Sequence, residues 1–377
     1  MAGWGLAQAN PSGISWHFFR DGAAALFGEA GLHTYAQHPE LQIGPLSLAV
    51  AGGLSLVFGA SAQAVAQILG TLVLPLIAWL LRGIGGRTAD GWRRDVPVWL
   101  VAAIGAPAWG VLAVRWAHLD DVLALGCIAA VVRLLAEPAV VRASTQGWLT
   151  GLLLAAATAS KPWAVIAVPL LLLLPGARLR IASGVTVVAG TLAAWLPFVL
   201  ADSGTLSALS PPVAIDPSSM LWLAGVHAEV VPSWVRTAQL LLGPAVAALL
   251  VLTGRWRFTL LGGVAVRLAL DPQNIAYYAA AVVVAAAVAD LAGTRTTRRG
   301  WPRPPWRTLI AAVVWWQPFV LDYPHRFTEA TGLALWWFQN PTAVAIVHAV
   351  WIGGVLGEAF WTPLNPRRGR PQDALSP

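Results

Sequence analysis

The chain has 377 residues, of which 57% are hydrophobic and only 11% are charged, and its formal net charge is +7. A soluble domain carries about 25% charged residues, so this composition excludes an ordinary soluble domain and predicts a polytopic membrane protein. The basic residues stand in short connections between apolar runs, which is how membrane topology is encoded, so nucleic acid is not the expected partner.

Apolar runs that approach the roughly 20 residues needed to cross a bilayer as a helix recur from Gly44 to Phe360. They are too continuous for the alternating strands of a barrel, so we expect helices. The predicted spans are 62–82, 96–114, 120–136, 147–160, 162–176, 182–201, 235–253, 258–270, 274–293, 309–321 and 340–358. The stretch 43–58 predicts a further span or an interfacial helix. The expected fold is all-α: a polytopic transmembrane helical bundle with about 11–12 spans.

The basic residues predict the sidedness of the bundle. When the spans are crossed in order, the arginines of 82–94, 133–142, 178–180, 255–257 and 294–307 and of the tail fall on one side. That side should be cytoplasmic, because cytoplasmic loops carry the excess of arginine and lysine. We therefore expect a multi-pass protein of a bacterial plasma membrane. It divides into an N-terminal segment (1–42), expected to form the first outward loop, a transmembrane domain (43–360) and a cytoplasmic tail (361–377).

The N-terminal segment contains "HFFRDGAAALFGEAGLHTYAQHPELQIGPLSL". Its aromatic residues and histidines indicate an amphipathic surface segment. Its titratable candidates are His17, Asp21, His33, His38 and Glu40.

The stretch "VRWAHLDDVLAL" (114–125) places His118, Asp120 and Asp121 between two apolar spans. Charged residues beside spans are costly and usually line a cavity or the interface. One interpretation is a polar helix cap, because capping and the helix dipole favour aspartate at a helix N-terminus. The other is a carboxylate pair that faces an outward cavity and binds a metal or a sugar hydroxyl.

Lys161 is the only lysine, and it stands in "AATASKPWAV" between two predicted spans. Because basic residues flank the two spans, the chain must cross and return within about thirty residues. Pro162 predicts a break there, which puts Lys161 near the outer leaflet. It is either a lysine that snorkels at a helix end or a cation for a lipid-linked phosphate.

The stretch "VRLALDPQNIAYYAAA" places Arg267 four residues before Asp271, a spacing at which the two can pair on one helix face. Tyr277 and Tyr278 follow at interface depth. An internal salt bridge beside an aromatic belt and a site for phosphate or sugar are both open interpretations. Further outward candidates are His325 and Arg326.

Motifs of soluble nucleotide-using enzymes are absent from the sequence: it contains neither a phosphate-cradling P-loop nor a G-x-S-x-G elbow. "HLDD" lacks the spacing of a zinc site on a helix, so no metal ligand is assigned. No cofactor is expected from the motifs, and a divalent metal remains an open alternative.

Four motifs, in this order, resemble the integral-membrane glycosyltransferases of the GT-C fold. "YAQHPELQIGPLSL" is similar to their Tyr-Pro-Pro-Leu-type passage into the membrane, and "HLDD" to their acidic second outward loop. "GLLLAAATASKPWAVIAVPLLLLLP" is similar to their hairpin with lysine at its tip, and "RLALDPQNIAYY" looks like a motif of actinobacterial members. Within that superfamily, the sequence looks like the bacterial polyprenyl-phosphate-sugar-dependent mannosyltransferases, including the GT87 group.

The resemblance implies transfer of a sugar, expected to be mannose, from polyprenyl phosphate to a glycolipid or glycan hydroxyl on the outer face, with inversion. A carboxylate of the first outward loop would deprotonate the acceptor, and cations would hold the departing phosphate. Asp21 is the candidate base. The sugar site would take His118, Asp120 and Asp121, and the lipid phosphate would contact Lys161 and Arg267.

This sequence departs from the family pattern in two ways. The family's first transmembrane helix is missing, and Ser15 stands before Trp16 where an aspartate is expected. Two alternatives therefore stay open: a membrane transporter or lipid flippase, and a non-catalytic family member. Because no internal repeat is evident and the polar residues lie toward one face, the enzyme is the favoured interpretation.

Overall fold

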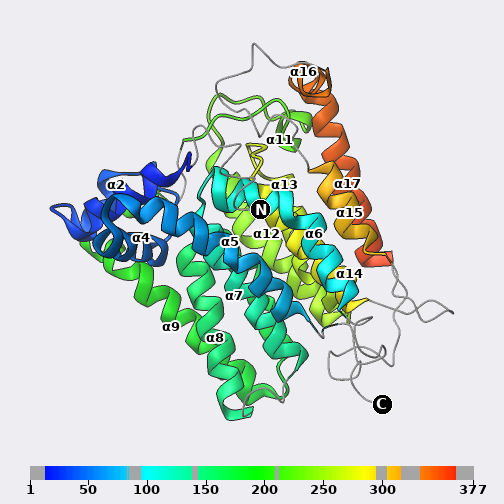
Figure 1. Cartoon of the computed structure of the whole chain (residues 1–377), viewed down its shortest axis with the longest axis horizontal. Helices are drawn as coiled ribbons and strands as arrows, with labels where there is room; N and C mark the ends of the chain where they lie inside the picture. The colour runs from blue at the N-terminus through cyan, green and yellow to red at the C-terminus, as the bar shows by residue number, and fades with distance from the viewer. Residues whose placement is uncertain are drawn as a thin grey trace.

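The computed structural model describes residues 13–82, 84, 95–137, 143–208, 212–293, 304–315 and 332–361. Every regular element within these ranges is helical, as predicted (Figure 1). Among the described residues, five segments are long and apolar enough to cross a membrane: Pro45–Leu81, Val96–Arg115, Ala177–Ala201, Ser233–Leu252 and Pro341–Trp361. Five is fewer than the predicted 11–12, because several predicted spans form shorter or more polar helices that run beside these five.

The helix bounds follow the predicted spans closely in most of the bundle. The helices are α2 (Trp16–Phe27), α3 (Thr34–Gln37), α4 (Pro45–Phe58), α5 (Ala62–Leu81), α6 (Val96–Gly110), α7 (Leu119–Ala136), α8 (Ala143–Ser160), α9 (Ala177–Ala201), α10 (Thr205–Ala208), α11 (Met220–Leu223), α12 (Ser233–Leu252), α13 (Thr259–Ala269), α14 (Tyr278–Ala292), α15 (Trp306–Val314), α16 (Gly332–Gln339) and α17 (Pro341–Trp361). The helix predicted over 274–293 begins later than expected, because residues 271–277 form a turn after Asp271.

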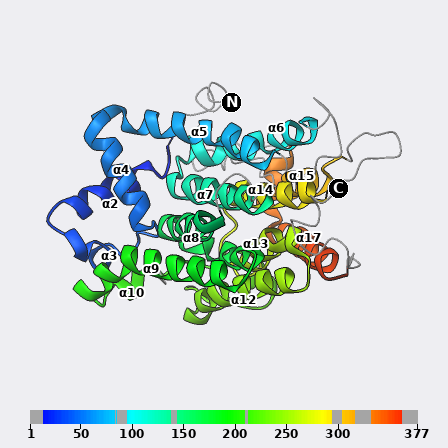
Figure 2. The same ribbon diagram turned by 90° about the horizontal axis from the view of Figure 1, so that it is seen from below.

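The N-terminal helices lie across one end of the bundle. Figure 2 shows α2 and α4 there, with α4 running across the direction of α5, α7, α8 and α9. Helix α4 nevertheless belongs with α5 to the apolar segment Pro45–Leu81, so both alternatives for 43–58 stay open. Buried Trp16, Phe19, Tyr35 and Leu48 form a small core of their own, which reaches Leu119 at the start of α7. The N-terminal segment is therefore packed onto the beginning of α7.

Helix α14 is the centre of the bundle, and all its residues from Ala279 to Leu291 are buried. Its sequence is almost entirely alanine and valine, and such small side chains let neighbouring helices approach on every side. Helices α6, α13 and α15 pack around it. Helix α9 is the opposite case: only Ser183, Val187 and Phe198 are buried along it.

The return from α8 to α9 is a 3-10 helix, labelled η6 (Pro162–Leu173), where the sequence predicted an ordinary helix over 162–176. Twelve residues rise about 24 Å as a 3-10 helix, against about 18 Å as an α-helix. The tighter winding thus lets a short segment make a long return. Its Pro162, Val165, Val168 and Leu171 are partly exposed while the residues between them are buried, which is the three-residue period of this helix type.

Because η6 returns along the bundle, α8 and α9 run parallel to each other. A Cβ on Gly151 of α8 would lie 2.5 Å from the carbonyl oxygen of Ser183 in α9, so only glycine permits this approach. Thr158 and Thr191 hydrogen-bond further along the same pair, at 2.8 Å.

The basic residues gather at the end of the bundle away from α2 and α4, which we call the basic end. Arg82 pairs with Asp95 at 2.6 Å, and Arg133 donates to the carbonyl of Arg82. Arg307 pairs with Asp290 at 2.8 Å and also with Glu358. These contacts join the ends of α5, α7, α14 and α17 to the starts of α6 and α15. The opposite end, where α8 ends and α7 and α12 begin, is called the site end below.

Candidate functional site

The site begins with an irregular turn between α6 and α7. Helix α6 continues as a π-helix over Val111–Arg115, a form that is often found at functional sites. Ala117 then takes a φ of +50°, and it is the only non-glycine residue with positive φ in the described ranges. Successive backbone N–H groups of Gly13, Ile14 and Ser15 donate to the carbonyls of residues 114–116 at 2.9–3.2 Å. Residues 13–15 thus hold the turn that leads into His118.

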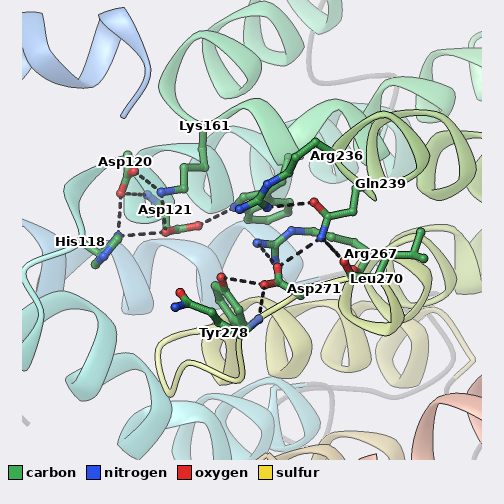
Figure 3. A network of polar contacts seen from close by, with 12 residues as sticks. His118, Asp120, Asp121, Lys161, Arg236, Gln239, Arg267, Leu270, Asp271 and Tyr278 are labelled. Atoms are coloured by element: carbon green, nitrogen blue, oxygen red, sulfur yellow. Dashed lines mark hydrogen bonds and ion pairs between the residues drawn. The ribbon is translucent and has the colours of Figure 1, made fainter. Parts of the chain in front are cut away.

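The first turn of α7 carries the buried polar network that the sequence singled out (Figure 3). Asp120 Oδ2 lies 2.5 Å from Lys161 Nζ, and Asp121 Oδ2 lies 3.7 Å from it. His118 Nδ1 lies 3.0 Å from Asp120 Oδ1 and 3.1 Å from Asp121 Oδ2. Burial opposes the charged imidazolium, but the carboxylates outweigh it and raise the pKa of His118 above its usual value. The aspartates do occupy a helix N-terminus, as the cap interpretation expected, yet they also hold Lys161.

Lys161 is fixed by the backbone on which it stands. It follows α8 directly, and its N–H donates to the carbonyl of Ala157 at 2.9 Å. The preceding carbonyl, of Ser160, accepts from the N–H of Gly44 at 3.0 Å and from Ser47 Oγ at 3.3 Å. The start of α4 therefore satisfies the end of α8 and holds the lysine in place. Lys161 is only 9% exposed and ion-paired, so the snorkelling interpretation is wrong.

A second polar group surrounds Arg267 on α13. Arg267 pairs with Asp271 at 3.2 Å, which confirms the pairing predicted from their spacing. Tyr278 donates to Asp271 at 3.3 Å, and the guanidinium of Arg267 lies 4.6 Å from the centre of the Tyr278 ring. Tyr277 turns instead toward the first group, where it stacks on His118 with ring centres 3.9 Å apart.

Trp163 joins the two groups. Its indole N–H donates to Asp121 Oδ1 at 2.6 Å, and the guanidinium of Arg267 lies 5.3 Å from its ring centre. The indole of Trp163 therefore contacts Asp121 with its edge and the guanidinium of Arg267 with its face. Such cation–π contact is favourable where water is excluded.

A cavity of about 110 Å³ opens beside Trp163 at the site end. Its charged lining is Lys161, Arg236 and Arg267. The remaining lining residues are Gln42, Pro162, Trp163, Val165, Ile166, Trp195, Gln239 and Leu240. The aspartates are not among them, because they lie behind Lys161. The space thus combines cationic and apolar walls.

The residues His118, Asp120 and Asp121 offer one ligand atom each within 4.8 Å of one another, a spacing at which three such groups could hold a metal ion. The ammonium of Lys161 already lies against both carboxylates, at the position where a cation would neutralise them. Trp163 and His118 use the remaining carboxylate oxygens. These donors fit an ammonium ion and do not fit a metal.

Two predicted residues lie apart from the network. Asp21 pairs with its neighbour Arg20 at 2.8 Å, with the two side chains 60% and 63% exposed. Phe19, two residues earlier on α2, is buried and lies 6.1 Å from the His118 ring, so the opposite face of the helix carries Asp21. His38 pairs with Glu40 at 3.3 Å on the exposed surface. The predictions on His325 and Arg326 lie outside the described residues.

Sequence reasoning missed Arg236, Gln239 and Trp163. Arg236 Nη1 donates to Gln239 Oε1 at 2.9 Å, and Gln239 Nε2 donates to the carbonyl of Leu270 at 2.9 Å. A signal existed for Arg236, since it is a lone charge in the first turn of an apolar helix. Trp163 stands among apolar residues, where nothing in the sequence separates a lining residue from a core one.

Comparisons with protein families, curated proteins and solved structures gave no match to this chain.

Proposed function

We propose that this protein is a membrane glycosyltransferase that moves a sugar from a polyprenyl-phosphate donor to a hydroxyl of a glycolipid or glycan. The observation that carries the proposal is the cavity at the site end, where Lys161 and Arg267 meet apolar walls from η6, α9 and α12. A ligand suited to such a cavity has an anionic head and an apolar tail. A lipid phosphate has both.

The buried carboxylates support this assignment by what they do to the cations. Asp120 and Asp121 fix the ammonium of Lys161, and Asp271 fixes the guanidinium of Arg267. Cations held in place before the reaction stabilise charge as it develops without reorganising, which is the main contribution of such groups to catalysis. In this proposal the aspartates position the two cations and do not touch the sugar themselves.

The proposed reaction is a single displacement. The acceptor oxygen attacks the anomeric carbon, and the bond between that carbon and the phosphate oxygen breaks. The electron pair leaves with the polyprenyl phosphate, where Lys161 and Arg267 stabilise the added negative charge. The acceptor proton passes to a base, the role that the resemblance implies for Asp21, which lies apart from the Lys161 network. Attack opposite the leaving group inverts the anomeric configuration.

The wider setting belongs to the same proposal. The bundle would be a GT-C-like arrangement in a bacterial plasma membrane, with the site end facing outward and the basic end in the cytoplasm. Mannose is the sugar that the resemblance implies. The donor would reach the site from within the bilayer, and the acceptor from the outer surface.

The test is transfer of radiolabelled sugar from a polyprenyl-phosphate donor in proteoliposomes that contain the purified protein. Wild type should transfer the label, while Lys161→Ala and Arg267→Gln should each lose about 10²–10³-fold in rate. Arg178→Gln, an exposed arginine at the basic end, is the control and should behave as wild type. Movement of the labelled lipid between leaflets without transfer to acceptor would replace the proposal with a lipid flippase.

A further inference from the structure

Arg236 is the one cation of the cavity whose charge is not matched by a carboxylate within the described residues. Lys161 lies 2.5 Å from Asp120, and Arg267 lies 3.2 Å from Asp271. For Arg236 the described partner is the neutral amide of Gln239, whose Oε1 accepts at 2.9 Å. Its Nε is buried without a hydrogen-bond partner in the described part of the chain.

The guanidinium of Arg236 therefore lacks a counter-charge, and its Nε lacks an acceptor, among the described residues. A buried donor without an acceptor is costly, and a partly buried cation needs a counter-charge to offset its lost hydration. Arginine offers several donors in a planar fork that fits the oxygens of phosphate. Because Arg236 lines the cavity, an anion within the cavity can supply what the chain leaves open.

Gln239 fixes the direction in which Arg236 points. Its Nε2 donates to the carbonyl of Leu270 at 2.9 Å, so its Oε1 is turned toward the guanidinium. The carbonyl of Leu270 ends α13 just after Arg267. The same turn therefore positions both arginines of the cavity. Gln239 acts through Arg236 and is a positioning residue.

The walls next to Arg236 indicate what the anion is attached to. Trp195 comes from α9, Val165 and Ile166 from η6, and Leu240 from α12. Leu240 is 42% exposed, and α9 and α12 are both long and apolar enough to cross a membrane. The apolar side of the cavity thus lies between two helices that are suited to cross the membrane, where an aliphatic chain from the bilayer could enter and pack.

We infer that Arg236 is the residue that recognises the phosphate ester of a membrane lipid, whose chain lies between α9 and α12 against η6. The identification of this lipid as the sugar donor rests on the proposed function. The binding itself does not, because it needs neither the sugar nor the acceptor. Lys161 and Arg267, already matched by carboxylates, then act on the charge that appears during the reaction.

The experiment measures binding by native mass spectrometry and by intrinsic tryptophan fluorescence, to which Trp163 and Trp195 of the cavity contribute, with the full chain in maltoside micelles. The probes are farnesyl phosphate, farnesol and inorganic phosphate. Wild type should bind farnesyl phosphate at least tenfold more tightly than either other probe. Arg236→Gln should weaken that binding by about tenfold to hundredfold, and Arg236→Lys by less, since it keeps the charge but loses the fork.

The matched control is Arg178→Gln, which removes the same charge at the basic end and should bind as wild type does. Each variant is first shown to elute and to unfold thermally like wild type. Gln239→Leu should weaken the binding of farnesyl phosphate but not of farnesol, whereas a purely structural role would weaken both. Unchanged affinity in folded Arg236→Gln would overturn the inference, as would equal binding of farnesol or of inorganic phosphate. Failure of sugar transfer, with these results intact, would refute the proposed function alone.

Discussion

Gly44 gives the sharpest prediction, because its Cα lies against the end of another helix. A Cβ at this position would lie 2.1 Å from the carbonyl oxygen of Ala159 and 2.5 Å from that of Ser160. Its φ of −72° suits any residue, so the requirement for glycine comes from the close approach alone. We predict that Gly44→Ala forces the start of α4 and the end of α8 apart.

The size of the effect follows from these distances. A carbon and an oxygen need about 1 Å more room than 2.1 Å, so the two helix ends must separate by about 1 Å. The bond from the N–H of Gly44 to the carbonyl of Ser160 then lengthens from 3.0 Å to roughly 4 Å and is lost. Overpacking costs about 1–3 kcal/mol and a buried polar group without its partner about 1–3 kcal/mol. The free energy of unfolding should fall by about 2–6 kcal/mol.

The assay is unfolding in mixed micelles of maltoside and SDS, followed by tryptophan fluorescence. Gly53→Ala on the same helix is the control, because a Cβ there meets no atom within 4 Å and its stability should equal that of wild type or exceed it by up to about 1 kcal/mol. Sugar transfer should also fall in Gly44→Ala, since Lys161 directly follows Ser160. If Gly44→Ala proved as stable as Gly53→Ala, the packing argument would be refuted.

Four further predictions concern the polar groups of the site end. Asp120→Asn and Lys161→Met should each lower the free energy of unfolding by about 3–5 kcal/mol. In a double-mutant cycle the double variant should lose less than the sum of the two, and additive losses would contradict the ion pair. Asp21→Asn should leave the unfolding midpoint unchanged, because its pair with Arg20 is exposed, while transfer falls about 10²–10⁴-fold if it is the base; retained transfer removes it from that role. Treatment with EDTA should not shift the midpoint, since Lys161 holds the carboxylates, and a drop would point to a metal. Because the pKa of His118 is raised in the folded protein, protonated His118 should stabilise the fold fully below pH about 6.5, and this stabilisation should be lost as the pH rises through the folded-state pKa. The unfolding midpoints of wild type and His118→Gln should therefore differ less as the pH rises. A difference that does not shrink would contradict this.

Much of the bundle could be predicted, because the length of each apolar run and the basic residues of each loop can be read from short stretches of sequence. The span predicted at 62–82 is α5, and the one at 120–136 is α7 within a residue. The 3-10 form of η6 could not be predicted, since every residue from 162 to 174 is apolar and such a run carries no period. The segment packs chiefly against α12, α8 and α13, which no local pattern in the sequence records.

The sequence predicted that the site residues lie at one end of the bundle, but not which of them are in contact. Crossing the predicted spans in order placed Asp120, Lys161 and Arg267 at one end, and the structure brings them into one network. Which carboxylate meets Lys161 depends on how α7 packs against α8, which no local pattern records. The resemblance implies Asp21 as the base, but the buried face of α2 is formed by Trp16, Phe19, Gly22 and Ala23, which leaves Asp21 exposed.

The three-residue winding of η6 makes this segment sensitive to insertions and deletions in an unusual way. Removing one residue would rotate everything beyond it by about 120° and turn the row of Val165, Val168 and Leu171 into the core. Removing three would keep that row in register but shorten the segment by about 6 Å. Lys161 and the start of α9 stand at its two ends, so a change in its length would alter the depth of the lysine relative to the helix that follows. Length variation in this part of the chain should therefore come in steps of three residues, each with a compensating change in α8 or α9.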